Sequence, residues 1–133
     1  MAVIRTRAAL ALQHESLGAA HVSETLGVEP TESFEIGDSF AHGTRVREHS
    51  HWALDSPVEG DLEIQLRALL DRLAPLHLAL RELRHDGYRL TWTCYVEEHD
   101  GDAAISLSAA ILNDLGTLPI DLWVDTFADA EPS

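Results

Sequence analysis

The chain contains no lysine, and its nine basic residues, all arginines, are set against 23 aspartates and glutamates. The formal net charge is therefore -14. Non-specific affinity for nucleic acid comes mainly from Lys and Arg side chains that displace counterions from the phosphate backbone. The shortage of cations argues against nucleic acid and anionic membrane surfaces as partners. It favours a basic protein as a partner, although a role in solubility alone also explains an acidic surface.

Cysteine is almost absent as well. The single Cys94 cannot form a disulfide within the chain, and no C-x-x-C pair is present for zinc or redox chemistry. Apolar runs are also short. The run that follows Arg5 and Arg7 stops at Gln13, which is too early for the core of a signal peptide, and no later run has the length of a membrane span. We therefore expect a cytoplasmic protein.

The motifs of several common enzyme classes are missing. The sequence has no G-x-S-x-G, Walker or G-x-G-x-x-G pattern, so hydrolase, phosphate-loop and dinucleotide-binding interpretations have no support. Cys94 alternates with Trp92 and Val96 on the apolar side of a predicted strand, which predicts a buried, unreactive thiol rather than a nucleophile. The sequence thus predicts no catalytic residue and no cofactor.

What the sequence does have is enough apolar surface for a core. Apolar residues make up 45% of the chain, and a length of 133 residues suits one domain. We expect a single domain over 1–133, with a frayed acidic tail at about 128–133.

Hydrophobic periodicity predicts an alternation of strands and helices. Strands are expected over 3–12, 33–38, 49–54, 88–96 and 120–125, and helices over 18–26, 62–83 and 106–115. Pro75 should kink the long helix or divide it in two. The order β-α-β-β-α-β-α-β predicts an α+β fold, a two-layer sandwich with the helices on one face of a mostly antiparallel or mixed sheet.

Several local signals refine this order. In the first helix, Leu17, Ala20 and Leu26 are expected to face inward. Ser56-Pro57-Val58-Glu59 is typical of a helix start, although Gly60-Asp61 immediately after it leaves the start of the long helix open by a few residues. Ser106 or Ser108 should cap the last helix. The segment 39–48 is expected to be a polar loop.

One weak internal repeat is present. Leu26-Gly27-Val28-Glu29-Pro30 and Leu115-Gly116-Thr117-Leu118-Pro119 each end a short predicted helix and lead to a strand. The hypothesis is a pair of pseudo-repeated β-α-β halves, and a chance similarity of helix-stop residues is the alternative.

Histidines give one candidate site. His49 and His51 alternate along a predicted strand, so their imidazoles could share a metal on one face. A third ligand would have to come from His42 or Glu48 in the preceding loop, and no established zinc motif is present. Solvated strand histidines are the alternative interpretation.

An acidic run and one tryptophan give the candidate partner-binding residues. The acidic run is predicted to be a loop without the ligand spacing of a calcium site, and it includes Glu97, Glu98, Asp100 and Asp102. It is either a landing point for a basic partner or a solvated turn. Trp123 is out of phase with Leu122 and Val124, so it should face water or a partner and could anchor an interface.

Short segments along the chain resemble a known family. They occur in the family's order and comprise Leu26-Gly27-Val28-Glu29-Pro30-Thr31, Gly37-Asp38, Trp52-Ala53-Leu54-Asp55-Ser56, Leu69-Leu70-Asp71-Arg72-Leu73-Ala74-Pro75 and Gly87-Tyr88. Over nearly its whole length the chain resembles the bacterial domain of unknown function family 4279. The resemblance implies a small bacterial α+β domain, and it carries no catalytic residues that could be transferred.

Two functions remain open from the sequence. The first is a non-enzymatic protein-binding module, an inhibitor or immunity-type partner of a basic protein. The second is a small-molecule or metal site, with or without enzymatic activity, around His42, His49 and His51 before Trp52. A monomer and a homodimer formed by edge-strand pairing are compatible with either function.

Overall fold

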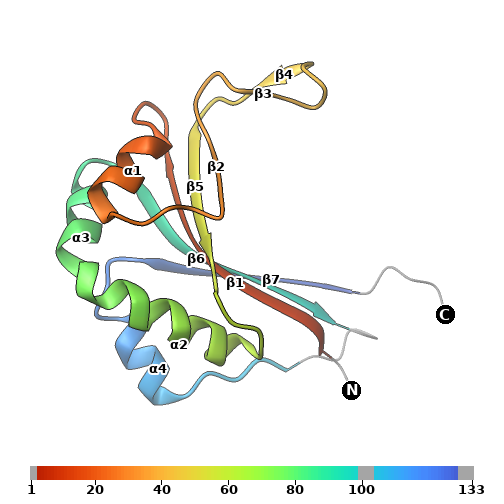
Figure 1. Cartoon of the computed structure of the whole chain (residues 1–133). Coiled ribbons are helices and arrows are strands. Elements are labelled where there is room, and N and C mark those ends of the chain that lie inside the picture. Colours follow the sequence, from red (N-terminus) through yellow and green to blue (C-terminus); the bar gives the residue numbers. More distant parts are fainter. Residues whose placement is uncertain (1–2, 99–103, 129–133) are drawn as a thin grey trace.

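The computed structural model describes residues 3–98 and 104–128 (Figure 1). The elements follow the order β1 (Val3–His14), α1 (Ala19–Leu26), β2 (Glu32–Phe34), β3 (Ser39–Phe40), β4 (Arg45–Val46), β5 (Ser50–Asp55), α2 (Leu62–Leu73), η1 (Ala74–Leu76), α3 (His77–His85), β6 (Arg89–Glu98), α4 (Ala109–Leu115) and β7 (Asp121–Ala128). The predicted α+β class is confirmed. Among the described residues, no helix combines the length and the apolar character needed to cross a bilayer.

The main sheet is mixed and has the strand order β2-β5-β1-β6-β7. The first four strands in this order pair with one another antiparallel, whereas the last strand, β7, runs parallel to β6. A parallel pair needs a crossover connection, and α4 lies in the connection between these two strands. The four α-helices lie along one face of the sheet (Figure 1).

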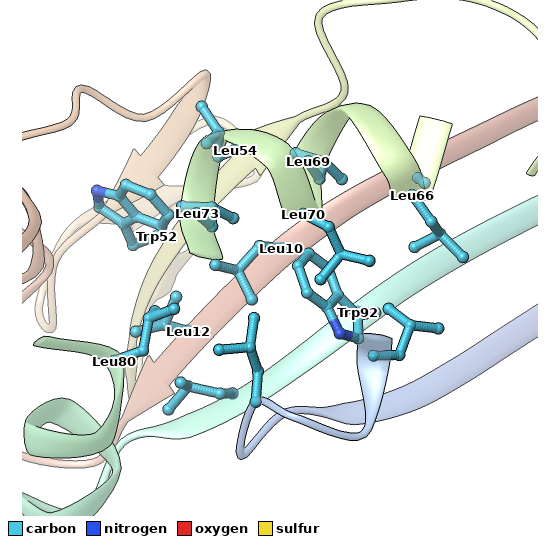
Figure 2. Packing of buried hydrophobic residues seen from close by; sticks show 14 of the residues in the cluster. Leu10, Leu12, Trp52, Leu54, Leu66, Leu69, Leu70, Leu73, Leu80 and Trp92 are labelled. Carbon is cyan, nitrogen blue, oxygen red and sulfur yellow. The ribbon is translucent and has the colours of Figure 1, made fainter. Parts of the chain in front are cut away.

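The core fills the space between the sheet and these helices (Figure 2). Trp52 on β5 and Trp92 on β6 are fully buried there, beside Leu10 and Leu12 of β1. Helix α2 covers them with leucines that recur at helical spacing: Leu62, Leu66, Leu69, Leu70 and Leu73. Each fully buried leucine stabilises the fold by about 1.5–3 kcal/mol relative to an exposed one.

Pro75 divides the long helix as predicted. Helix α2 ends at Leu73, the 3-10 turn η1 follows, and α3 begins at His77. Proline lacks the N–H that would continue the α-helical pattern, and its ring clashes with the preceding turn.

The helix-start signature at Ser56 does not begin a helix, whereas the leucine spacing placed the start of the long helix correctly. Helix α2 begins at Leu62, and the carboxylate of Asp61 caps it by accepting the N–H of Ile64 at 3.0 Å. Gly60 has φ of 133°, which no helix accommodates, so the helix cannot begin before it. Ser56 instead closes a tight turn with the backbone of Val58.

Ser108 is the residue that caps the last helix. Its Oγ accepts the N–H of Ile111 at 3.2 Å. Glu63 of α2 supports this cap, since its carboxylate accepts the N–H of Ser108 at 2.7 Å and the hydroxyl at 2.9 Å.

The predicted inward face of the first helix is wrong in two of three residues. Ala19, Val22 and Leu26 are the buried residues of α1, whereas Leu17 and Ala20 are exposed. The helix begins one residue later than predicted and has no capping side chain at Gly18. The carboxylate of Glu35 takes that role, since it accepts the N–H groups of the first two helical residues at 2.7 and 3.0 Å.

The segment 33–48 also differs from the prediction. Strand β2 ends at Phe34, and the expected polar loop contains the β3–β4 hairpin, which projects beyond the sheet (Figure 1). The hairpin has no apolar alternation that would have revealed it. It is held instead by the guanidinium of Arg47, which lies 3.9 Å from the ring centres of both Phe34 and Phe40.

The two halves of the proposed repeat end their helices differently. Gly27 closes α1 with a left-handed φ of 68°, whereas Gly116 closes α4 with φ of -67°. Strands β6 and β7 are neighbours, but β5 lies between β1 and β2. These differences do not support two pseudo-repeated halves, and the hypothesis stays a prediction.

Candidate functional site

The face of the sheet opposite the helices forms an open trough of about 720 Å³. Small residues from the three central strands form its floor: Ala9, Ala11, Ala53, Thr91 and Thr93. The strand register brings them together, because Ala11 lies opposite Ala53 on one side and Thr91 on the other. Longer side chains surround them, so the face is hollow at its centre.

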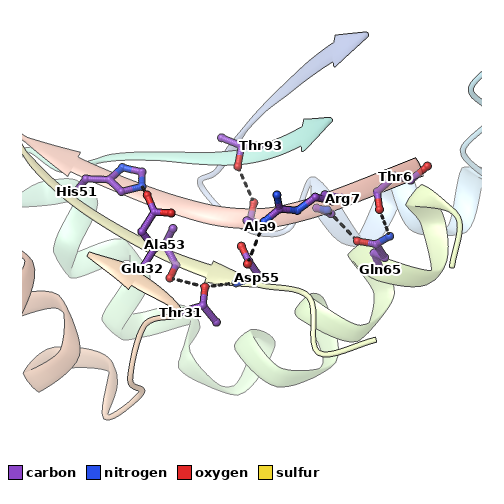
Figure 3. A network of polar contacts seen from close by, with 11 residues as sticks. Thr6, Arg7, Ala9, Thr31, Glu32, His51, Ala53, Asp55, Gln65 and Thr93 are labelled. Atoms are coloured by element: carbon purple, nitrogen blue, oxygen red, sulfur yellow. Dashed lines mark hydrogen bonds and ion pairs between the residues drawn. The ribbon is translucent and has the colours of Figure 1, made fainter. Parts of the chain in front are cut away.

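The rim on the β2–β5 side is polar (Figure 3). Arg7 Nη2 lies 3.4 Å from the carboxylate of Asp55. The Nε2 of His51 lies 3.7 Å from Glu32, and the side-chain amide nitrogen of Gln13 lies 3.2 Å from the Nδ1 of the same histidine. These contacts pair the charges of this rim with one another.

The imidazole of His51 is partly buried on this face of the sheet. Burial lowers the pKa of His51 because it penalises the imidazolium, and nearby His49 and Arg47 act in the same direction. Glu32 opposes them and offsets part of the decrease. The ring also stacks on Phe34, with centroids 5.0 Å apart and planes inclined by 20°.

His51→Gln should flatten the pH dependence of stability below about pH 6.5, the ordinary pKa of histidine. Because burial lowers the pKa of His51 in the folded state, the unfolded chain binds its proton first as the pH falls. The free energy of unfolding of the wild type should therefore decrease from about pH 6.5 down through the folded pKa. Urea unfolding across this range measures the effect. Parallel curves for the variant and the wild type below pH 6.5 would contradict it.

The rim on the β6–β7 side carries an exposed aromatic pair. The rings of Tyr95 and Trp123 meet edge to face, with centroids 5.5 Å apart, and they are 39% and 47% exposed. Asp121 and Asp125 lie two residues before and after Trp123 on the same strand face. Trp123 thus points away from the core as predicted, and its role in an interface stays a prediction.

The predicted acidic loop is partly strand. Glu97 and Glu98 belong to β6, and Glu97 pairs with Arg5 of β1 at 3.2 Å. Asp100 and Asp102 lie outside the described residues. The charge of Glu97 is therefore already paired. Its assignment to a loop is wrong, because Glu97 lies within β6 opposite Arg5 of β1, and the sequence does not reveal that strand pairing.

The three histidines of the metal hypothesis lie at different places. His42 is at the tip of the β3–β4 hairpin with φ of 57°, whereas His49 and His51 both contact Phe34. Within residues 3–98 and 104–128, no group of three or more His, Cys, Asp or Glu residues is placed to hold a metal. The metal site stays a prediction without a third ligand from this part of the chain.

Cys94 lies on the core side of β6, as the alternation predicted. Burial raises the pKa of its thiol to about 12, so the thiolate form is strongly disfavoured.

Sequence reasoning found Trp123 but missed its surroundings. The signal for the trough was present in small residues at alternate positions, namely Ala9 and Ala11 in one strand and Thr91 and Thr93 in another. These residues face away from the large apolar side chains of the same strands. The strand order that brings these residues together cannot be read from the sequence, because it depends on contacts between segments that are distant in the chain.

Comparisons with known proteins agree with the resemblance seen in the sequence. A family model described as Domain of unknown function (DUF4279) matches residues 4–129. Searches of curated proteins and of solved structures gave no significant match. Since the family match spans nearly the whole chain, the protein belongs to the DUF4279 family.

Proposed function

We propose that this protein is a non-enzymatic protein-binding module, an inhibitor or immunity-type partner of a basic protein, and that its partner docks on the open face of the sheet. The observation that carries the proposal is the exposed Tyr95–Trp123 pair, which lies on this face between two aspartates.

The aromatic pair supports a protein interface. Tyrosine and tryptophan are enriched among the residues that contribute most to binding, because they bury a large area and lose little conformational entropy. Both rings are already fixed against each other at the end of the trough. A partner would therefore meet a preorganised anchor.

The charge of the same region supports a basic partner. Asp121 and Asp125 have no ion-pair or hydrogen-bond partner among the residues that the structure describes. They add to the field of a chain with a net charge of -14. Such a field accelerates association with a cationic protein and weakens as salt rises.

The shape of the trough favours a protein over a small molecule. A small ligand is usually bound in a pocket that covers most of its surface. Here the floor is open along the sheet, and the buried thiol of Cys94 lies on the opposite side. The arrangement offers contact area rather than enclosure.

Trp123→Ser should reduce recovery of the partner about tenfold, because the truncation removes the central aromatic anchor. Affinity capture from a native lysate, at low and at high salt, measures this with the tagged protein as bait. Leu78→Ser is the matched control, since Leu78 is an exposed apolar residue on α3, in the helical layer.

Two results would contradict the proposal. One is that the wild type captures no basic protein at low salt. The other is that Trp123→Ser captures the partner as fully as Leu78→Ser does.

A further inference from the structure

Among the strands that the structure describes, β7 has a neighbour on one side and none on the other. It is the last strand of the sheet order and pairs only with β6, over residues 121–128. No other strand lies against its outer edge in the part of the chain that the structure describes. Its outward N–H and C=O groups are therefore available to another chain.

This edge lacks most of the features that usually prevent pairing. It is eight residues long, whereas β2 at the other edge has three. It contains no proline, no glycine and no lysine. Three of its apolar side chains are well exposed: Leu122 at 43%, Trp123 at 47% and Phe127 at 45%.

We propose that the partner adds an extended segment to the edge of β7, as a sixth strand of the sheet. This inference rests on the proposed function and specifies its mode of binding. Main-chain hydrogen bonds to β7 would supply affinity, and side-chain pairs across the two strands would supply selectivity.

The side chains of β7 specify the chemistry of that segment. Its open face presents Asp121, Trp123, Asp125 and Phe127, and its other face presents Leu122, Val124 and Thr126. Residues directly opposite each other on paired strands share a face. The segment should therefore carry Arg or Lys opposite each aspartate, four residues apart, with apolar β-branched residues opposite Leu122 and Val124.

A second copy of this chain is a poorer occupant. In antiparallel pairing of β7 with itself, with both open faces on one side, the register decides which residue of the other copy lies opposite Asp125. That residue is Asp121, Trp123, Asp125 or Phe127. None of these registers places a cation opposite an aspartate. The two chains, each with a net charge of -14, also repel each other.

Peptide binding with blocked backbone donors tests the inference. The parent is a labelled peptide of sequence Arg-Val-Thr-Val-Arg, extended by one Thr at each end. It is compared with two N-methylated versions. In one version the backbone nitrogens of the odd-numbered residues are methylated, and in the other those of the even-numbered residues. In an added strand, alternate N–H groups point toward β7 and away from it. We expect the parent to bind, one methylated set to weaken binding about tenfold, and the other set to have much less effect. Fluorescence anisotropy gives the affinities.

Three outcomes would overturn the inference. They are no binding of the parent peptide, equal binding of all three peptides, and equal loss for both methylated sets. Equal binding of the three peptides would indicate that the peptide docks through its side chains and charge, without forming an added strand. The capture experiment with Trp123→Ser judges the proposed function separately, because it does not depend on how the partner's backbone is held.

Discussion

Gln65→Leu should lower the free energy of unfolding by about 3 kcal/mol, a loss comparable to that of a large buried side chain. Gln65 lies on α2 and is only 4% exposed. Its amide nitrogen donates to the carbonyl oxygen of Thr6 at 2.7 Å (Figure 3). The same nitrogen donates to the carbonyl oxygen of Gly60 at 2.8 Å, and the side-chain carbonyl oxygen accepts the N–H of Ala8 at 2.8 Å.

The reason lies in the unequal lengths of two strands. Strand β1 pairs with β5 from Ala9 to His14, and within the described part of the chain no strand lies beside the preceding residues of β1 on that side. The amide of Gln65 takes the place of the missing strand. Leucine would leave one N–H and two C=O groups without partners, and each buried group without a partner costs about 1–3 kcal/mol, reduced where water can reach it.

Urea unfolding of matched variants measures this prediction. Gln13→Leu is the control, because Gln13 lies on β1, the strand that Gln65 contacts, but its side chain makes a single hydrogen bond among the described residues, to His51 at 3.2 Å on the open face. It should cost less than about 1 kcal/mol. Equal stabilities for the two variants would show that Gln65 does not substitute for a strand.

The parts of the fold that could be predicted are those whose pattern lies within one short segment of the sequence. The alternation in β1 and β6 and the leucine spacing in α2 each reflect burial against one layer, and Pro75 breaks a helix wherever it occurs in the interior. The start of α2 could not be predicted from Ser56 because a capping signature is also compatible with a tight turn. The conformation of Gly60 decided between them.

The site could be predicted only in part, because strand register assembles it. The phase of Trp123 within its strand was visible in the sequence, but its contact with Tyr95 depends on parallel pairing of β6 and β7. Glu97 was read as part of an acidic loop, since Arg5, its ion-pair partner, is distant in sequence. The sequence thus identified the exposed tryptophan and not the surface that surrounds it.

Asp121→Arg combined with Asp125→Arg should weaken binding of the basic partner, or of the parent peptide, about 100-fold or more at low salt. The double change replaces two attractive contacts with two repulsive ones at the centre of the proposed interface, and placing like charges together costs several kcal/mol. Neither aspartate has a side-chain partner among the described residues, and both lie on an edge strand, so the fold should tolerate the change.

A control with the same change in net charge separates contact from the long-range field. Asp71→Arg combined with Glu82→Arg changes two exposed residues of α2 and α3, in the helical layer. Long-range attraction depends on total charge and is screened beyond about 10 Å at 0.1 M salt, whereas contacts within an interface are screened less. If the aspartates touch the partner, the β7 variant should stay much weaker than the helix variant at moderate salt. Equal affinities for the two variants would mean that the partner senses the charge of the whole molecule and does not dock on β7.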